Sequence, residues 1–170
     1  MFTLPVLASS LEDDYKELLP DIEFLNIQTA ANLKILEPYI QKGNAVAMYM
    51  AAQMYESGEL ISKDETKAFE LYLKSADKNP ASQFAVANMY VAGKGCEPSL
   101  EKAIDYYQKA ALNGDESLKT SAEQKIAELQ NIQKKEALLK EIEIKALSAE
   151  LIFNFLLIFF SKNKLIFNKE

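Results

Sequence analysis

Few residues in this chain have types and spacings that could support chemistry. The sequence contains no histidine, so the commonest general base and metal ligand is missing. Cys96 is the single cysteine, which excludes an intramolecular disulfide and a cysteine-built zinc site within one chain. We interpret Cys96 as a packing residue in a loop, because apart from Lys94 nothing near it in sequence would stabilise a thiolate.

Three other groups of residues resemble ligand sites but have simpler explanations. Residues 93–95 (Gly-Lys-Gly) lack the glycine spacing and the preceding strand of a phosphate loop. The acidic residues 12–14 point in different directions on a helix, and we expect them to be solvated. Met54 and Met89 occupy equivalent positions of a repeat, so we expect them to pack in the core. The sequence thus offers no catalytic residue, no cofactor site and no metal site.

The composition limits the class of partner. The chain has 170 residues, 49% of them hydrophobic, which is enough for one folded domain with a sizeable core. Its net charge is -6, and all 19 positive residues are lysine. Arginine makes the bidentate contacts that phosphates and base edges favour. Because the chain has no arginine, nucleic acid is not an expected partner.

An internal repeat supplies the elements that must position any functional residue. Residues 44–78 and 79–113 align at an offset of 35, with ten identities, where roughly two are expected by chance. A period of this length indicates a solenoid, because each unit must bury its apolar face against its neighbours. The identical pairs are Asn44/Asn79, Ala52/Ala87, Met54/Met89, Tyr55/Tyr90, Gly58/Gly93, Lys67/Lys102, Ala68/Ala103, Tyr72/Tyr107, Lys74/Lys109 and Ala76/Ala111.

Each copy predicts two helices. Gly58 and Gly93 stand where a left-handed residue would end the first helix. Asp64 and Ser99 stand where an N-cap would begin the second helix. Alanine lets two helices approach closely, while tyrosine fills the space between successive units. The residues to which we assign this structural role are Ala52, Tyr55, Gly58, Ala68, Tyr72, Ala76, Ala87, Tyr90, Gly93, Ala103, Tyr107 and Ala111.

The motif residues carry a family resemblance. The second copy reads Asn88-Met89-Tyr90-x-x-Gly93-x-Gly95, then Glu101-Lys102-Ala103-x-x-Tyr106-Tyr107-x-Lys109-Ala110-Ala111-x-x-Gly114. This pattern of glycines and paired aromatic residues resembles a Sel1-like repeat, a relative of the tetratricopeptide repeat. The resemblance implies an all-α fold, a right-handed α-solenoid of antiparallel helix pairs. From Glu116 onward the sequence strongly favours helix, so we also expect a long C-terminal helix.

The expected organisation follows the repeat. We expect an N-terminal segment with a short helix at 1–29, a helix of a degenerate repeat at 30–43, full repeats at 44–78 and 79–113, a capping helix at 114–132 and a helical, hydrophobic tail at 133–170. Residues 1–8 read either as the end of a signal peptide without its positive start or as an apolar N-terminal cap on the solenoid. The chain would be periplasmic or secreted if such a signal begins upstream, and cytoplasmic otherwise.

The resemblance also implies a function. Bacterial Sel1-like repeat proteins are non-enzymatic adaptors that bind a protein or peptide on the concave face of the solenoid, which the first helix of each repeat lines. The candidate residues on those helices outside the buried pattern are Met50, Gln53, Glu56, Ala85, Asn88 and Val91. Gln53 and Asn88 could both donate to and accept from a peptide backbone. The alternative of binding or hydrolysing β-lactams, proposed for cysteine-rich relatives, is disfavoured by the single cysteine.

The C-terminal tail leaves four interpretations open. Residues 151–160 read LIFNFLLIFF, about half of the 20 or so residues that a bilayer-spanning helix needs, so we do not expect a membrane span. The tail could pack on the solenoid, self-associate through its helix, or contact a membrane through residues 151–167. Its seven lysines and five glutamates after residue 132 favour an anionic surface. It could also be an accidental extension of the reading frame.

Overall fold

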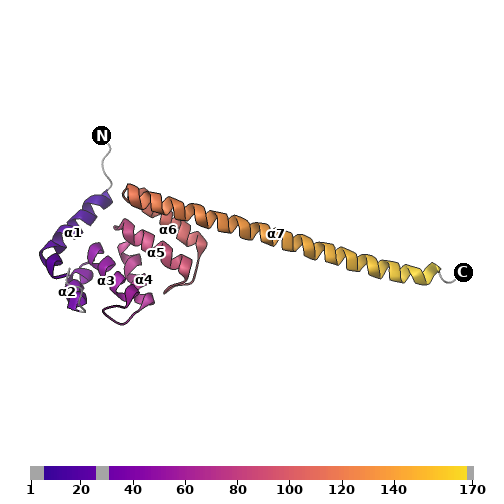
Figure 1. The fold of residues 1–170 in the computed structure, drawn as a ribbon, viewed down its shortest axis with the longest axis horizontal. Coiled ribbons are helices and arrows are strands. Elements are labelled where there is room, and N and C mark those ends of the chain that lie inside the picture. Colours follow the sequence, from indigo (N-terminus) through magenta and orange to yellow (C-terminus); the bar gives the residue numbers. More distant parts are fainter. Residues whose placement is uncertain (1–5, 26–30, 168–170) are drawn as a thin grey trace. The chain divides into compact units, whose positions relative to one another are not determined.

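The computed structural model describes the backbone of residues 6–25 and 31–167, and within these ranges the chain forms seven helices and no strand (Figure 1). It divides into two compact units, Met1–Leu129 and Gln130–Glu170. The predicted all-α class and the long C-terminal helix are confirmed. The helices are α1 (Val6–Leu25), α2 (Ala31–Gln41), α3 (Ala45–Ser57), α4 (Glu65–Ser75), α5 (Pro80–Ala92), α6 (Leu100–Asn113) and α7 (Glu116–Phe167).

The helix ends of the two repeats follow from local sequence. Gly58 ends α3 with φ 69° and Gly93 ends α5 with φ 65°, both in the left-handed region that favours glycine. The side chain of Asp64 accepts a hydrogen bond from the backbone N–H of Lys67 at the start of α4. Ser99 does the same for Lys102 in α6. The predicted helix ends are therefore confirmed.

The loops that join the two helices of each repeat are closed in the same way. The backbone N–H of Asp64 donates to the carbonyl of Tyr55, and that of Ser99 donates to the carbonyl of Tyr90, each over 3.0 Å. The spacing between these residues, which is the same in both repeats, thus has a structural reason. It brings the start of the second helix back to the end of the first.

Small and aromatic residues alternate through the core of the first unit. Ala52, Ala68, Ala87 and Ala103 are each fully buried, so that neighbouring helices approach closely. Equivalent aromatic pairs fill the space beside them. The ring centroids of Tyr49 and Tyr72 are 5.7 Å apart, and those of Phe84 and Tyr107 are 5.1 Å apart. These edge-on and tilted contacts are the geometries that aromatic rings prefer.

Helix α1 precedes the repeats and is longer than the short helix expected for residues 1–29. Its 20 residues contact both α2 and α3. The following helix, α2, continues through Pro38. Residues 1–5 of the suggested signal-peptide remnant lie outside the described residues, whereas Val6 to Ala8 belong to the first turns of α1.

The first turns of α7 belong to the core of the first unit. Ala122 and Leu129 are buried in the same cluster as Ala103, Tyr107 and Ala110 of the second repeat. These turns close the apolar edge that a last repeat would otherwise leave open to water.

Candidate functional site

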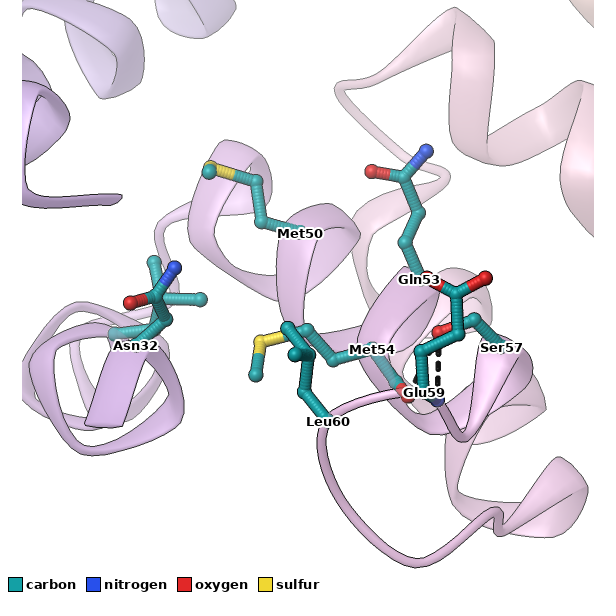
Figure 2. Close-up of a pocket in the computed structure, with 8 residues that line it drawn as sticks. Asn32, Met50, Gln53, Met54, Ser57, Glu59 and Leu60 are labelled. Carbon is teal, nitrogen blue, oxygen red and sulfur yellow. Dashed lines mark hydrogen bonds between the residues drawn. The ribbon is translucent and has the colours of Figure 1, made fainter. Parts of the chain in front are cut away.

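A cavity of about 300 Å³ lies between α2, α3 and the loop that follows α3 (Figure 2). Leu36, Met50, Met54 and Leu60 give it an apolar lining. Asn32, Gln53, Ser57 and Glu59 provide its polar atoms. In Figure 2 the side chains of Met54 and Leu60 lie next to each other between the two helices. The cavity lining therefore combines four apolar with four polar side chains, and ligand sites likewise combine apolar walls with polar groups that orient the ligand.

The cavity coincides with a difference between the two repeats. At an offset of 35, Leu60 corresponds to Gly95. Gly95 has φ +67°, and a Cβ added to it would lie 2.1 Å from the backbone oxygen of Glu65. The second loop is therefore pressed against the start of α4, the second helix of the preceding repeat. The first loop carries a leucine at this position, and its side chain lines the cavity beside α2 instead.

Of the six candidate binding residues, the structure brings Met50 and Gln53 together in this cavity. Met50 is half-buried and Gln53 is exposed. The Nε2 atom of Gln53 donates to the hydroxyl of Tyr49 over 3.0 Å. This bond uses one of the two N–H donors of the Gln53 amide. Because Tyr49 lies four residues earlier in the same helix, the bond also fixes the orientation of the amide.

Two more candidates are bound to buried tyrosines. The hydroxyl of Tyr72 donates to Oε2 of Glu56 over 2.9 Å, and that of Tyr107 donates to Oδ1 of Asn88 over 2.5 Å. The side chains of Glu56 and Asn88 thus have a role in holding the two helices of a repeat together. Sequence reasoning missed this role, because the two tyrosines are equivalent while their acceptors occupy different repeat positions.

The remaining two candidates, Ala85 and Val91, have no polar side-chain atoms. Ala85 is half-buried and packs against the core cluster that contains Ala52 and Ala68, and Val91 is 39% exposed. Met54, expected in the core, is only half-buried and lines the cavity, whereas its counterpart Met89 is 1% exposed. Met54 packs against the core as expected but also lines the cavity, and the Leu60/Gly95 difference is the sequence signal for that second role.

A second cavity, of about 320 Å³, is lined by residues of α2, α3 and α4, among them Lys34, Glu37, Tyr55 and Lys67. The Nζ atom of Lys67 lies 4.5 Å from the centre of the Tyr55 ring. The equivalent pair in the second repeat, Lys102 and Tyr90, has a separation of 5.3 Å. Because this cation–π pair recurs in both repeats, it explains two of the sequence identities as structural.

Cys96 is the chain's single thiol. Burial raises the pKa of the half-buried Cys96 thiol, which opposes thiolate formation. Within the part of the chain that the structure describes, no group of three or more His, Cys, Asp or Glu side chains could hold a metal ion.

Asp14 corrects the expectation that the acidic residues 12–14 are solvated. Its Oδ2 atom accepts a hydrogen bond from the backbone N–H of Ala45 over 2.9 Å. Its backbone oxygen accepts from Nδ2 of Asn44 over 2.7 Å. The first N–H groups of α3 have no partner within their own helix, and a carboxylate from α1 satisfies one of them. Asp14 thus fixes α1 to the first repeat.

The described helices from α1 to α6, with the first turns of α7, define the first unit as an α-solenoid of two-helix repeats. A model of the Sel1 repeat matches residues 45–80 and 80–115. Two consecutive segments of the chain are therefore similar to the Sel1 repeat, and the predicted resemblance is confirmed. The crystal structure of a Sel1 repeat protein from Oxalobacter formigenes superposes with a TM-score of 0.53 and 25% identity, covering 70% of this chain and 89% of that one.

Three curated yeast proteins are similar to the repeat region. The chain is 39% identical over 77 residues to chitin synthase regulator SKT5 and 35% identical over 79 residues to activator of C kinase protein 1, both from Saccharomyces cerevisiae. It is 37% identical over 67 residues to chitin synthase regulatory factor 3 from Schizosaccharomyces pombe. These alignments cover 44%, 43% and 38% of this chain but only 11%, 13% and 7% of the relatives. The bacterial setting that the resemblance implied stays an expectation.

Proposed function

We propose that the chain is a non-catalytic interaction module that binds a linear segment of another protein in the cavity between α2 and α3. The observation that carries this proposal is the apolar lining of Leu36, Met50, Met54 and Leu60, bordered by polar side chains. Its volume of about 300 Å³ is at the small end of ligand sites. One large apolar side chain of a peptide would fill it, and the two methionines would adapt to its shape.

The polar border selects the neighbours of that side chain. Gln53 donates to Tyr49 through Nε2, so its Oε1 atom is the one that would accept from a peptide N–H. Glu59 is exposed at the same border and would attract a lysine or arginine beside the apolar anchor. The preferred ligand is therefore a large apolar residue flanked by a basic one.

Glu56, Ala85, Asn88 and Val91 would extend this surface along α3 and α5 for a longer ligand. Glu56 and Asn88 each already accept from a tyrosine, so their contribution to binding would come from the polar atoms that remain. The placement of this surface on the concave side of the solenoid is part of the proposal.

The biological role that fits such a module is regulatory. The names of the three yeast relatives describe a regulator, an activator and a regulatory factor. By analogy, the chain would hold or position an enzyme or another partner without itself transforming a substrate. The β-lactam alternative would require turnover of, or covalent labelling by, a chromogenic cephalosporin. The half-buried Cys96, whose thiol pKa is raised by burial, gives it no support.

A displayed library of random peptides, selected on the intact chain, tests the proposal. We expect enriched peptides to share a large apolar residue next to a lysine or arginine. Leu60→Trp, which fills the cavity, and Gln53→Ala should lower the affinity of such a peptide by about tenfold or more, and Glu59→Lys should remove the basic preference.

The matched control is Leu112→Ala in α6, where the side chain is 83% exposed and far along the sequence from the cavity. This variant should bind normally. Enriched peptides that bind Leu60→Trp and Gln53→Ala as well as they bind the original chain would contradict the proposal, provided that circular dichroism shows all variants to be folded.

A further inference from the structure

The second unit contains an apolar stretch of α7 whose side chains are uncovered. The exposed fractions of its large apolar residues range from 44% to 71%. One 18-residue window of the helix has a mean hydropathy of 1.7, with none of it buried, so by length and composition this helix could cross a membrane. The exposed residues are Leu147, Leu151, Ile152, Phe153, Phe155, Leu156, Leu157, Ile158, Phe159 and Phe160.

Most polar residues in and beside this stretch lie on one narrow stripe, and the exceptions, Lys145 and Ser148, are in its first two turns. Successive residues of an α-helix advance by about 100°, so Glu143, Glu150, Asn154 and Ser161 fall within roughly 40° of one another around the axis. The large apolar residues occupy most of the remaining circumference. The stretch is therefore not an amphipathic helix of the ordinary kind, whose polar face is as broad as its apolar face.

This distribution distinguishes between the candidate occupants. A two-stranded coiled coil buries a narrow apolar seam and leaves the other positions in water. Pairing with a second copy would therefore leave most of these phenylalanines and leucines exposed to water. A helix lying in a membrane interface needs a broad polar face toward water. A helix that is apolar around most of its circumference is covered on all sides only by a protein core or by lipid.

The sequence-based expectation of no membrane span considered only residues 151–160. The structure extends the helix without interruption from Glu116 to Phe167, so apolar residues on both sides of that segment belong to the same helix. From Ile144 to Ser161 the helix is about 27 Å long, close to the roughly 30 Å hydrocarbon thickness of a bilayer. Lys145 lies at one end of this stretch, and Lys162 and Lys164 follow the other in sequence. Lysines at such positions favour headgroups.

We propose that residues 144–161 of α7 are embedded in a lipid bilayer and attach the repeat unit to a membrane. The polar stripe is compatible with this environment, because Glu150 and Asn154 are four residues apart. This spacing allows their side chains to satisfy each other along the helix. Lipid then covers the remaining, apolar circumference.

The chain contains no tryptophan, so a single introduced indole reports its own surroundings. The experiment compares intact chains carrying Phe155→Trp or Leu138→Trp, mixed with phosphatidylcholine vesicles with and without phosphatidylserine. Leu138 is a matched control, because it is 56% exposed on the same helix but lies in its charged part. We expect brominated acyl chains to quench the tryptophan of Phe155→Trp and not that of Leu138→Trp. The bound protein should also float with vesicles in high salt.

A charge at the centre of the stretch provides the second arm. Leu156→Lys should lower partitioning into vesicles about a hundredfold, while Leu138→Lys should not change it. Release of the intact chain by high salt would show surface attachment only and overturn the proposal. Lack of quenching of Phe155→Trp would also overturn it. Soluble oligomers in sedimentation velocity that do not bind vesicles would do the same, because they would show that a second copy covers the apolar surface.

Discussion

The buried hydroxyl of Tyr107 in α6 donates a hydrogen bond to Oδ1 of the exposed Asn88 in α5. The two residues thereby fix the second helix of a repeat to the first. The same tyrosine in the preceding repeat, Tyr72, uses Glu56 instead. The repeat thus keeps the donor and varies the acceptor.

Asn88→Ala should destabilise the repeat unit by about 1–2 kcal/mol, because it leaves the Tyr107 hydroxyl without its acceptor. Tyr107→Phe should destabilise the unit less than this, because it removes the hydroxyl itself and so leaves no buried donor without a partner. Denaturant unfolding of both single variants and the double variant measures the coupling. If the two effects add without coupling, the hydrogen bond does not contribute to stability.

Alkaline pH should destabilise the repeat unit through the same tyrosine. Burial raises the pKa of Tyr107 to about 12, with a smaller contribution from Glu128, whereas an unfolded tyrosine titrates near 10. Between these values the unfolded state loses its proton first, so stability is fully present below about pH 10 and declines as pH rises toward about 12.

Circular dichroism during denaturation at several alkaline pH values measures this decline. In Tyr107→Phe, the loss of unfolding free energy over this pH range should be smaller by roughly 2 kcal/mol. Other buried tyrosines, including Tyr72, also have pKa values raised chiefly by burial, so some decline should remain. An unchanged slope in Tyr107→Phe would show that Tyr107 does not titrate differently in the folded state.

Gly95→Ala should be more damaging than Gly43→Ala. Both glycines have positive φ, but a Cβ at Gly43 meets nothing within 4 Å, whereas one at Gly95 would collide with the backbone of Glu65. We expect about 1 kcal/mol for the strain at Gly43 and several kcal/mol at Gly95. Thermal unfolding of the two variants separates strain from collision. Equal losses would mean that the second loop can move away from α4.

Asn44→Ala should destabilise the chain by about 2 kcal/mol and Asn79→Ala by about 1 kcal/mol. Both asparagines cap a helix, but Asn44 also donates to the backbone oxygen of Asp14 in α1. Hydrogen exchange gives the spatial readout. Amides of α1 should lose protection in Asn44→Ala but keep it in Asn79→Ala, and the reverse pattern would contradict this role of Asn44.

The parts of the fold that depend on local rules could be predicted from the sequence. Gly58 and Gly93 end helices because only a left-handed residue fits there, and Asp64 caps a helix because its neighbours need an acceptor. The bond between Asn44 and Asp14 could not be predicted, because residues 30 apart leave no periodic pattern.

The candidate site was predicted only in part. Met50 and Gln53 lie in the cavity, but the hydrogen bonds of Glu56 and Asn88 to tyrosines depend on side-chain positions that repeat alignment does not give. The tail shows a different limit. The count of apolar residues at 151–160 underestimated how well the helix suits a bilayer, because that also depends on how the apolar residues are distributed around the helix.

The Leu60/Gly95 difference suggests how an array of this kind can acquire a new binding specificity. A glycine at this position seals the seam between neighbouring repeats, while a larger residue leaves a cavity and contributes to its wall. Duplication of a sealed repeat, followed by replacement of this glycine and movement of its loop away from the neighbouring helix, would therefore create a pocket. In a longer array, each seam could be opened or closed independently of the others.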